Sequence, residues 1–506
     1  MDARGEADRG EARALAATVA MRAPALLRAG AIDLTSSFEQ SLYMMLRSWE
    51  REDRDRMRVR PAPIARIVPF ARLARAARRI PFDRRSEAPG GALILISAAV
   101  HARLLAPVAA QAMQSFGMPL RVLAAPSAGI VAKDAGASAL ASVQQLENIL
   151  HLGWLPRLGV LAVRNAAMAD WATAPWTGID PPRAEILRPV ATEAIPRLAL
   201  MAARLDSAVR RLQPAVLATY DESGIWSRLL PAVAHANHLP ALDLPHGEAA
   251  DPWGTMGAAY DMMAVFGPRA ASVLRAANIP AERITEVGAP ALDELVREFP
   301  TPYRPWASER RVILLASQPA APWAPHHTKE ARAIVLQAAM AIGSDVQPAR
   351  LVVRPHPTED RADIANEIEG LALPAGLEVV MDDGMALAEL LRNAWLMVTA
   401  YSQTTFEAVI AGVPTVSVNA TANPYASDLA ADGLVIAATD PASAVAAARS
   451  LISEDSRRGH VETARANLTR RTGRLDGHAT DRTANLLFSV AQSGGPAPSA
   501  RCRPFR

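Results

Sequence analysis

The sequence predicts an α/β protein with two domains, each built on a parallel β-sheet covered by helices, behind a helical N-terminal extension. Apolar strand-like runs alternate with helical stretches from residue 88 onward, which is the pattern of parallel sheets. A proline-rich break at 299–310 divides this alternation into two parts. The length of 506 residues is sufficient for two or three domains.

Composition excludes several classes of protein. Half of the residues are apolar, which is enough to fill sizeable cores, and a net charge of +3 does not favour a nucleic-acid-binding protein. The only cysteine, Cys502, excludes an intramolecular disulfide and a cysteine-based metal site. The sequence shows no run of 18 apolar residues and no signal peptide. We therefore expect a cytoplasmic protein.

The N-terminal extension covers residues 1–87 and is expected to be helical between 10 and 50. Its segment 51–85 contains 12 Arg and 4 acidic residues, a net charge of +8, with apolar residues between the arginines. A basic amphipathic segment can lie on an anionic membrane surface, which would make the protein peripheral to the membrane. The alternative is an arm that folds over the protein's own first domain.

The first domain is expected at 88–297. Predicted strands include 91–100, 121–126 and 214–220, with a helix at 227–238 and a strand at 241–247. Asp221 and Glu222 follow the strand at 214–220, and His246 ends the strand at 241–247. Because ligands bind at the carboxyl ends of parallel strands, these three residues are candidates for acid–base chemistry. The alternatives are a helix N-cap for the acids and a turn position for His246.

The remaining chain is divided in the same way. Residues 298–310 are interpreted as a hinge and 311–470 as the second domain, which begins with the strand RVILLAS. Residues 471–492 are predicted to form a helix that crosses back to the first domain. The tail at 493–506 has low complexity and is expected to be disordered.

Two polar clusters in the second domain each follow an apolar strand. The first is Arg354-Pro355-His356-Pro357, and the second is Ser402-Gln403-Thr404-Thr405. A guanidinium, an imidazole, three hydroxyls and a helix N-terminus at one sheet edge suit a phosphate or pyrophosphate.

The second cluster predicts its local structure closely. Thr404 and Glu407 have the spacing of a capping box, with Thr404 as N-cap of a helix at 405–411. Gly412 and Pro414 end that helix, and TVSV at 415–418 forms the next strand. Ser402 and Thr405 then remain as hydroxyls that the cap does not need.

The order of these motifs resembles the C-terminal half of GT-B glycosyltransferase-like proteins. The R-P-H-P turn is followed by S-x-T-T-x-E-A-x-x-x-G-x-P, and upstream lie LPALDLPHGE at 239–248 and the segment 263–295. The resemblance covers about residues 215–420. More narrowly, the motifs resemble those of bacterial capsule-polysaccharide and surface-carbohydrate transferases. CDP-glycerol glycerophosphotransferases and UDP-N-acetylglucosamine 2-epimerases share much of the layout.

The resemblance implies a GT-B fold, with two Rossmann-like domains facing a central crevice. It implies a glycosyltransferase that moves a sugar from a nucleotide-activated donor to a cell-surface polysaccharide or lipid-linked acceptor, with inversion and without a metal or another cofactor. Donor phosphates would bind Arg354, His356 and the 402–405 turn. His246, or an acid at 221–222, would take the acceptor proton. The alternatives are transfer of a phospho-alcohol from CDP-glycerol, 2-epimerisation, and a non-catalytic protein that kept the fold.

Two other signals are given less weight. Met381-Asp382-Asp383-Gly384 resembles an acidic motif of bacterial sialyltransferases, but it follows the R-P-H-P turn, whereas theirs precedes the His-Pro motif. We interpret it as a turn that ends a strand. Adjacent carboxylates point in different directions and have no suitably spaced third ligand, so we expect no metal site.

Overall fold

The computed structural model describes most of both predicted domains and part of the N-terminal extension. The described residues are 3–22, 24–48, 90–96, 99–124, 142–145, 194–195, 198–199, 201–202, 205–220, 225–244, 247–248, 260–301, 306, 309–320, 326, 328–356, 359–371 and 373–493. His246, Asp221, Glu222, the basic segment 51–85 and the tail after 493 lie outside them.

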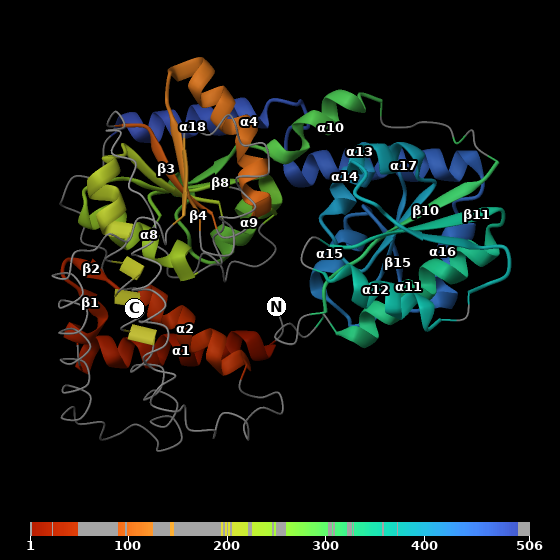
Figure 1. Ribbon diagram of the computed structural model, residues 1–506, viewed down its shortest axis with the longest axis horizontal. Helices are drawn as coiled ribbons and strands as arrows, with labels where there is room; N and C mark the ends of the chain where they lie inside the picture. Colours follow the sequence, from red (N-terminus) through yellow and green to blue (C-terminus); the bar gives the residue numbers. More distant parts are fainter. Residues whose placement is uncertain are drawn as a thin grey trace. The chain divides into compact units, whose positions relative to one another are not determined.

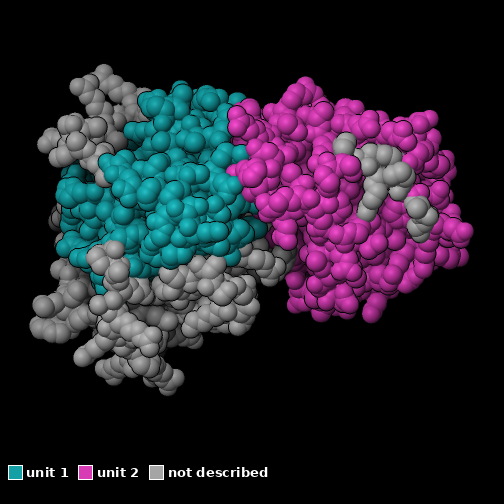
Figure 2. All heavy atoms as spheres, turned by 90° about the horizontal axis from the view of Figure 1, so that it is seen from above, with its two compact units in different colours: residues 1–265, 271–290, 480–506 teal, residues 266–270, 291–479 magenta. Residues whose placement is uncertain are grey.

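The chain forms two compact units (Figure 2). Unit 1 contains residues 1–265, 271–290 and 480–506, and unit 2 contains residues 266–270 and 291–479. The predicted hinge at 298–310 therefore lies within the range of unit 2. The last helix, α18 (Ala479–Ser493), belongs almost entirely to unit 1.

Unit 1 is built on a seven-stranded parallel sheet (Figure 1). Its central strands β3, β6 and β7 are short and wholly buried, which agrees with the apolar runs in the sequence. In spatial order they are β5 (Ser142–Gln145), β4 (Leu120–Ala124), β3 (Ala92–Ile96), β6 (Val216–Thr219), β7 (Ala241–Asp243), β8 (Met262–Val265) and β9 (Ile284–Glu286).

Helices cover both faces of this sheet. Helices α4 (Ala99–Phe116) and α18 share one apolar core with the strands, and the rings of Phe116 and Phe488 stack there with centroids 4.2 Å apart. Helix α8 (Ile225–Ala236) packs on β6 and β7. Helix α9 (Pro268–Ala276) follows β8.

The N-terminal residues form a layer of their own on α8. Helices α1 (Ala3–Arg22) and α2 (Thr35–Ser48) pack together, joined by a short hairpin of β1 (Arg28–Ala29) and β2 (Ile32–Asp33). Helix α2 and β2 contact α8, as Figure 1 shows for the red segments. Phe38 is fully buried in this layer. The described part of the extension is thus part of unit 1.

A buried ionic group lies under this layer. Arg228 of α8 is 3% exposed and lies near Glu39 of α2. Burial lowers the pKa of the Arg228 guanidinium to about 10, although the nearby Glu39 raises it. Burial also raises the pKa of Glu39, against the opposing charges of Arg13 and Arg228.

Unit 2 is built on a six-stranded parallel sheet. In spatial order its strands are β12 (Glu378–Met381), β11 (Ala349–Arg354), β10 (Arg311–Ala316), β13 (Leu396–Thr399), β14 (Thr415–Val418) and β15 (Ile436–Ala438). Chain order reverses between β10 and β13. This reversal is a topological switch point, where open α/β sheets bind ligands at the carboxyl ends of the strands.

Eight helices of unit 2 are described. They are α10 (Asp293–Glu298), α11 (Lys329–Asp345), α12 (Arg361–Glu369), α13 (Leu387–Asn393), α14 (Thr404–Ile410), α15 (Pro424–Ala431), α16 (Pro441–Arg449) and α17 (Glu454–Thr472). Figure 1 shows α13, α14 and α17 on one side of the sheet and α11, α12 and α16 on the other. Among the described residues, no helix has the length and apolar character needed to cross a bilayer.

Candidate functional site

The switch point of unit 2 is tied together by polar contacts between strand ends. Thr399 at the end of β13 donates its hydroxyl to the carbonyl of Ala316 at the end of β10, at 3.0 Å. Two residues beyond the ends of these strands, the Tyr401 N–H donates to Oε1 of Gln318 at 3.1 Å. These contacts fix the two loops that begin at the site.

Arg354 ends β11 and lies at this carboxyl edge. Its Nη1 donates to Asp382 Oδ2 at 2.9 Å and to the carbonyl of Met385 at 2.8 Å. Its side chain is 31% exposed, whereas that of Asp382 is 5% exposed. Among the described residues, no hydrogen bond or ion pair uses Nε or Nη2 of Arg354. The guanidinium is therefore held at Nη1, and its Nε–Nη2 edge remains available to donate to an anion.

The second cluster leads into α14, and its cap differs from the prediction. The helix begins at Thr404, its N-cap is Gln403, and no side chain caps it, so the expected capping box with Thr404 as N-cap is wrong. Instead Ser402 Oγ accepts a hydrogen bond from the Thr404 N–H at 3.1 Å and donates to Thr404 Oγ1 at 3.0 Å. The Ser402 side chain forms the turn before the helix.

The hydroxyls of this cluster differ in accessibility. Ser402 and Thr404 are partly exposed, and the Thr404 hydroxyl lies near enough to the Glu407 carboxyl to lower its pKa. Thr405 is fully buried, and its hydroxyl has no hydrogen-bond partner in the described part of the chain. The structure gives Thr405 no exposed surface for a ligand, which does not support the predicted contact of its hydroxyl with a phosphate.

The end of α14 follows the prediction. Gly412 has φ of 74°, and its N–H donates to Val409, while the Val413 N–H donates to Ala408 at 2.8 Å. This is a Schellman motif, which favours glycine because of the left-handed φ. Strand β14 then begins at Thr415, as expected.

Burial strongly perturbs the titration of Glu407 at this edge. Burial raises the pKa of its carboxyl to about 7, although Arg354 and the Thr404 hydroxyl both act to lower it. Arg354, Thr404 and Glu407 are thus close enough to interact. They come from β11 and α14, which flank the switch point.

His356 follows Arg354 in a turn fixed by Glu359. The Glu359 carboxylate accepts hydrogen bonds from the His356 N–H at 2.7 Å, from Ser317 Oγ at 2.9 Å and from Arg332 at 3.1 Å. The His356 residue is exposed overall, but the protein atoms around its ring lower its pKa, and Glu359 opposes this. A neutral imidazole can donate one hydrogen bond to a phosphate oxygen.

A small cavity of about 30 Å³ lies beside the switch point. Ala316, Ser317 and Gln318 line it after β10, and Ala400 lines it after β13. This volume holds about two water molecules, so the cavity can receive only a small part of a ligand.

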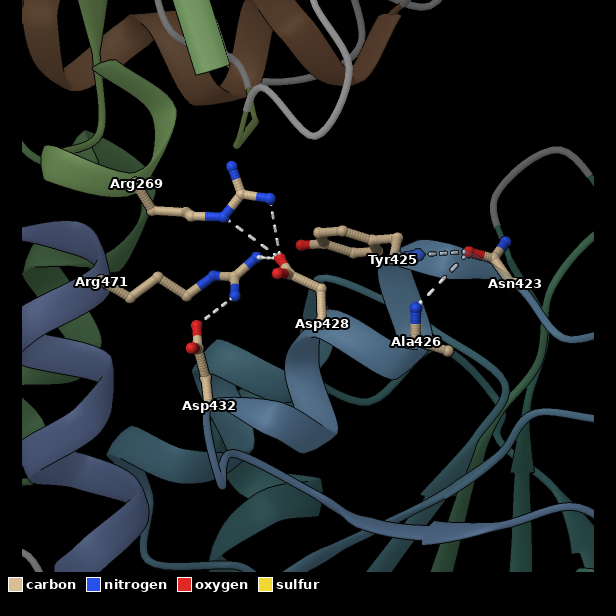
Figure 3. A network of polar contacts seen from close by, with 7 residues as sticks. All are labelled: Arg269, Asn423, Tyr425, Ala426, Asp428, Asp432 and Arg471. Carbon is tan, nitrogen blue, oxygen red and sulfur yellow. Dashed lines mark hydrogen bonds and ion pairs between the residues drawn. The ribbon is translucent and has the colours of Figure 1, made fainter. Parts of the chain in front are cut away.

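The loop after β14 completes the edge of the site. Asn423 caps α15 by accepting hydrogen bonds from the N–H groups of Tyr425 at 2.8 Å and Ala426 at 3.4 Å (Figure 3). Nδ1 of His326 lies 3.1 Å from both the carbonyl and the hydroxyl of Thr421, so the loop after β10 contacts the loop after β14.

Helix α15 is fixed from its other side by arginines. Arg471 of α17 is 2% exposed, pairs with Asp428 at 2.8 Å and with Asp432, and lies over the Tyr425 ring (Figure 3). Arg269 also pairs with Asp428, at 3.1 Å. These charges are satisfied by each other, so we assign them to the support of α15.

The candidate catalytic residues belong to unit 1 in sequence. Asp221 and Glu222 follow Tyr220 after β6, and His246 follows β7; all three lie outside the described residues. The described neighbours are buried: Thr219 Oγ1 lies 3.0 Å from Ser227 Oγ, and the Tyr220 ring contacts His101 edge-on. Strands β3 and β6 form the switch point of this sheet.

Sequence reasoning missed three residues at the site of unit 2. Asp382 was interpreted only as part of a turn, and Glu359 and Gln318 were not singled out. Each follows a strand within a few residues, and this position is the signal that could have identified them. No group of three or more potential metal ligands occurs among the described residues.

Comparison with known proteins shows the fold. No protein-family model and no curated protein matches the chain. Solved structures of similar fold include a UDP-GlcNAc 2-epimerase from Neisseria meningitidis bound to UDP-GlcNAc, with 12% identity, coverage of 79% of this chain and 100% of that chain, and a TM-score of 0.51.

Two further solved structures are similar to this chain. The UDP-GlcNAc 2-epimerase from Methanocaldococcus jannaschii, in complex with UDP-GlcNAc and UDP, has 12% identity, coverage of 79% and 99%, and a TM-score of 0.51. The calicheamicin glycosyltransferase CalG4 has 16% identity, coverage of 80% and 100%, and a TM-score of 0.49. The two helix-covered parallel sheets and the structures with a TM-score of 0.51 show that the chain has the two-domain GT-B fold, which confirms the fold predicted from the sequence.

Proposed function

We propose that the protein is a glycosyltransferase whose unit 2 binds the nucleotide diphosphate of an activated sugar. The observation that carries this proposal is Arg354, held at Nη1 with its other nitrogens open, beside Thr404 and Glu407. A guanidinium edge matches two oxygens of a phosphate group. The two UDP-GlcNAc 2-epimerases with this fold were solved with UDP-GlcNAc or UDP bound, so UDP is the first nucleotide to test.

In the proposed reaction, an acceptor hydroxyl attacks the anomeric carbon of the donor sugar. The bond from that carbon to the phosphate oxygen breaks, and the nucleotide diphosphate leaves with the electron pair. His246, or else Asp221 or Glu222, takes the acceptor proton. Arg354, His356, Ser402 and the 404–407 segment stabilise the leaving diphosphate. Displacement from the opposite side inverts the anomeric configuration.

The acceptor is proposed to be a cell-surface polysaccharide or a lipid-linked saccharide. The basic segment 51–85 would hold the protein at an anionic membrane that carries such a lipid. The reaction would need no metal, because guanidinium and hydroxyl donors offset the diphosphate charge.

A second candidate is 2-epimerisation of UDP-N-acetylglucosamine. The observation in its favour is that UDP-GlcNAc 2-epimerases reach a TM-score of 0.51 over nearly their whole length. An epimerase would act on the nucleotide sugar alone, without an acceptor.

The experiment is an incubation of the full chain with UDP, CDP and GDP sugars and CDP-glycerol, with and without a lipid-linked acceptor. A transferase releases nucleotide diphosphate only with acceptor, and the acceptor gains the mass of the sugar. A CDP-glycerol enzyme instead releases CMP and adds glycerol phosphate. Conversion of UDP-GlcNAc alone to its 2-epimer supports the second candidate. No turnover of any donor contradicts both.

A further inference from the structure

The turn after β12 holds Arg354 at one nitrogen through two different acceptors. Asp382 Oδ2 and the Met385 carbonyl both accept from Nη1, at 2.9 and 2.8 Å. Because both acceptors face the same corner of the guanidinium, its plane and direction are fixed. A single acceptor would leave rotation about that contact.

This turn is itself rigid. Oδ1 of Asp382 accepts the N–H groups of Gly384 at 3.1 Å and Met385 at 2.9 Å. The Asp382 N–H donates to Val353 at 2.8 Å, which continues the sheet, and Arg361 donates to the Asp382 carbonyl. Gly384 has φ of 104°, a conformation that favours glycine. Each polar atom of Asp382 thus has a partner.

Glu407 is a competing partner for the same guanidinium. Its carboxyl lies near enough to Arg354 to interact electrostatically, and among the described residues no other arginine acts on its charge. Without Asp382, Glu407 is a carboxyl toward which Arg354 could turn, and this attraction is strongest where Glu407 is ionised, above pH about 7. The guanidinium would then turn its open edge toward a protein carboxylate.

We propose that Asp382 is a positioning residue, which holds Nη1 of Arg354 so that the Nε–Nη2 edge presents two donors to a nucleotide phosphate. The inference rests on the proposed function, because it assigns the anion at that edge to a nucleotide. Asp382 itself does not touch the ligand. It acts through Arg354, which it orients and keeps from Glu407.

The neighbouring residue provides a matched control. Asp383 is the next carboxylate in the chain, is exposed, and accepts no hydrogen bond that the structure records in the described residues. Removal of either charge changes the net charge near the site equally. Only removal of the Asp382 charge breaks the contact with Arg354.

The test is a double-mutant cycle on UDP affinity, measured by calorimetric titration of the full chain. The variants are Asp382→Asn, Arg354→Gln, their combination and Asp383→Asn. Asparagine keeps an oxygen for the Gly384 and Met385 N–H groups, so the turn is retained; Asp382→Ser is a second variant with the same property. Circular dichroism and thermal unfolding check the fold of each.

We expect Asp382→Asn to weaken UDP binding about 10-fold and Asp383→Asn to change it less than about 2-fold. In the Arg354→Gln background, Asp382→Asn should have no further effect, whereas a merely structural residue would weaken binding in both backgrounds. Equal effects of Asp382→Asn and Asp383→Asn, or additive effects in the cycle, overturn the inference while the proposed function stands. If the wild-type chain binds no UDP, CDP or GDP, the proposed function fails and the inference fails with it.

Discussion

Arg354 combines two tasks that a lysine cannot combine. One nitrogen is held by Asp382 and Met385, and the opposite edge is open. A lysine ammonium is a single point charge, so it can satisfy the turn or a phosphate but not present a fixed two-donor edge.

Arg354→Lys should therefore weaken nucleotide binding about 10- to 150-fold, the loss of a charge-assisted contact. Calorimetric titration with UDP measures this loss. The control is Arg350→Lys on the same strand, where Arg350 forms an exposed ion pair with Glu378. Unchanged UDP affinity in Arg354→Lys, with a normal fold, contradicts the assignment of Arg354.

Glu407 predicts a pH-dependent stability. Its folded-state pKa of about 7 lies above the unfolded value of 4.5, so the folded chain keeps this proton where the unfolded chain releases it. The carboxyl therefore costs stability progressively as pH rises from about 4.5 to 7, and the full cost applies above 7.

Glu407→Gln should remove this cost. Relative to wild type, the variant should gain up to about 3 kcal/mol between pH 4 and pH 8, measured by urea unfolding at each pH. Glu389→Gln on α13 is the control, because Glu389 is exposed. If the difference in unfolding free energy between Glu407→Gln and wild type does not change with pH, the pKa of Glu407 is not raised in the folded chain.

At the scale of elements, the sequence predicted strands and helix positions well and local caps less well. The strand at 415–418, the glycine stop at Gly412 and the helix that follows residue 220 agree with the expectation. The cap of α14 was misassigned by one residue, because the Ser402 hydroxyl accepts the Thr404 N–H that a capping box would give to the Glu407 side chain. Apolar periodicity is a property of long segments, whereas a cap depends on which nearby side chain accepts a hydrogen bond from the backbone N–H.

The position of the N-terminal layer was the part of the fold that the sequence predicted least. Its helices were expected, but their place on α8 depends on contacts between segments nearly 190 residues apart in the chain, such as Glu39 with Arg228. No local pattern contains that information. The consequence is that deletion of residues 1–87 would remove part of unit 1 together with the basic segment.

Phe38 tests this layer. Phe38→Ala should destabilise the protein by about 3–5 kcal/mol, because the ring is fully buried between helices. Met21→Ala is the control, since Met21 is 80% exposed and should change stability by less than about 0.5 kcal/mol. Equal urea midpoints for the two variants would mean that the N-terminal layer does not pack on the rest of unit 1.

The basic segment requires a deletion that spares this layer. A chain lacking only residues 51–85 should lose salt-sensitive binding to anionic vesicles, because each basic residue near such a surface contributes about 1 kcal/mol. Flotation with vesicles that contain anionic lipid, at low and high salt, measures the binding. Vesicle binding that survives the deletion, or absence of binding by the full chain, removes the membrane role.

For the whole molecule, the account predicts activity without a metal. The described residues contain no group of three potential metal ligands, and Arg354 and the hydroxyls of Ser402 and Thr404 can offset phosphate charge. Turnover should persist in excess EDTA. Loss of turnover on chelation, with recovery on addition of Mg²⁺ or Mn²⁺, would place a metal in the reaction.

The whole fold was predictable because four motifs occur in one order along the chain, and each marks a strand end. The site was predictable only in part. Arg354 and Glu407 carry recognisable motifs, whereas Asp382 and Glu359 act through contacts that depend on how β11, β12 and α12 pack. Spacing in the sequence does not reveal which acid meets which arginine.

The central claim is that unit 2 binds the diphosphate of a nucleotide through Arg354. The most direct measurement is calorimetric titration of the wild-type chain and of Arg354→Gln with UDP, CDP and GDP, with uridine as a ligand without phosphate. The account predicts saturable binding of at least one diphosphate by the wild type, weakened at least 10-fold by Arg354→Gln, a loss of about 1.4 kcal/mol or more. Absence of binding by the wild type to all three diphosphates, or equal affinity in the variant, would contradict it.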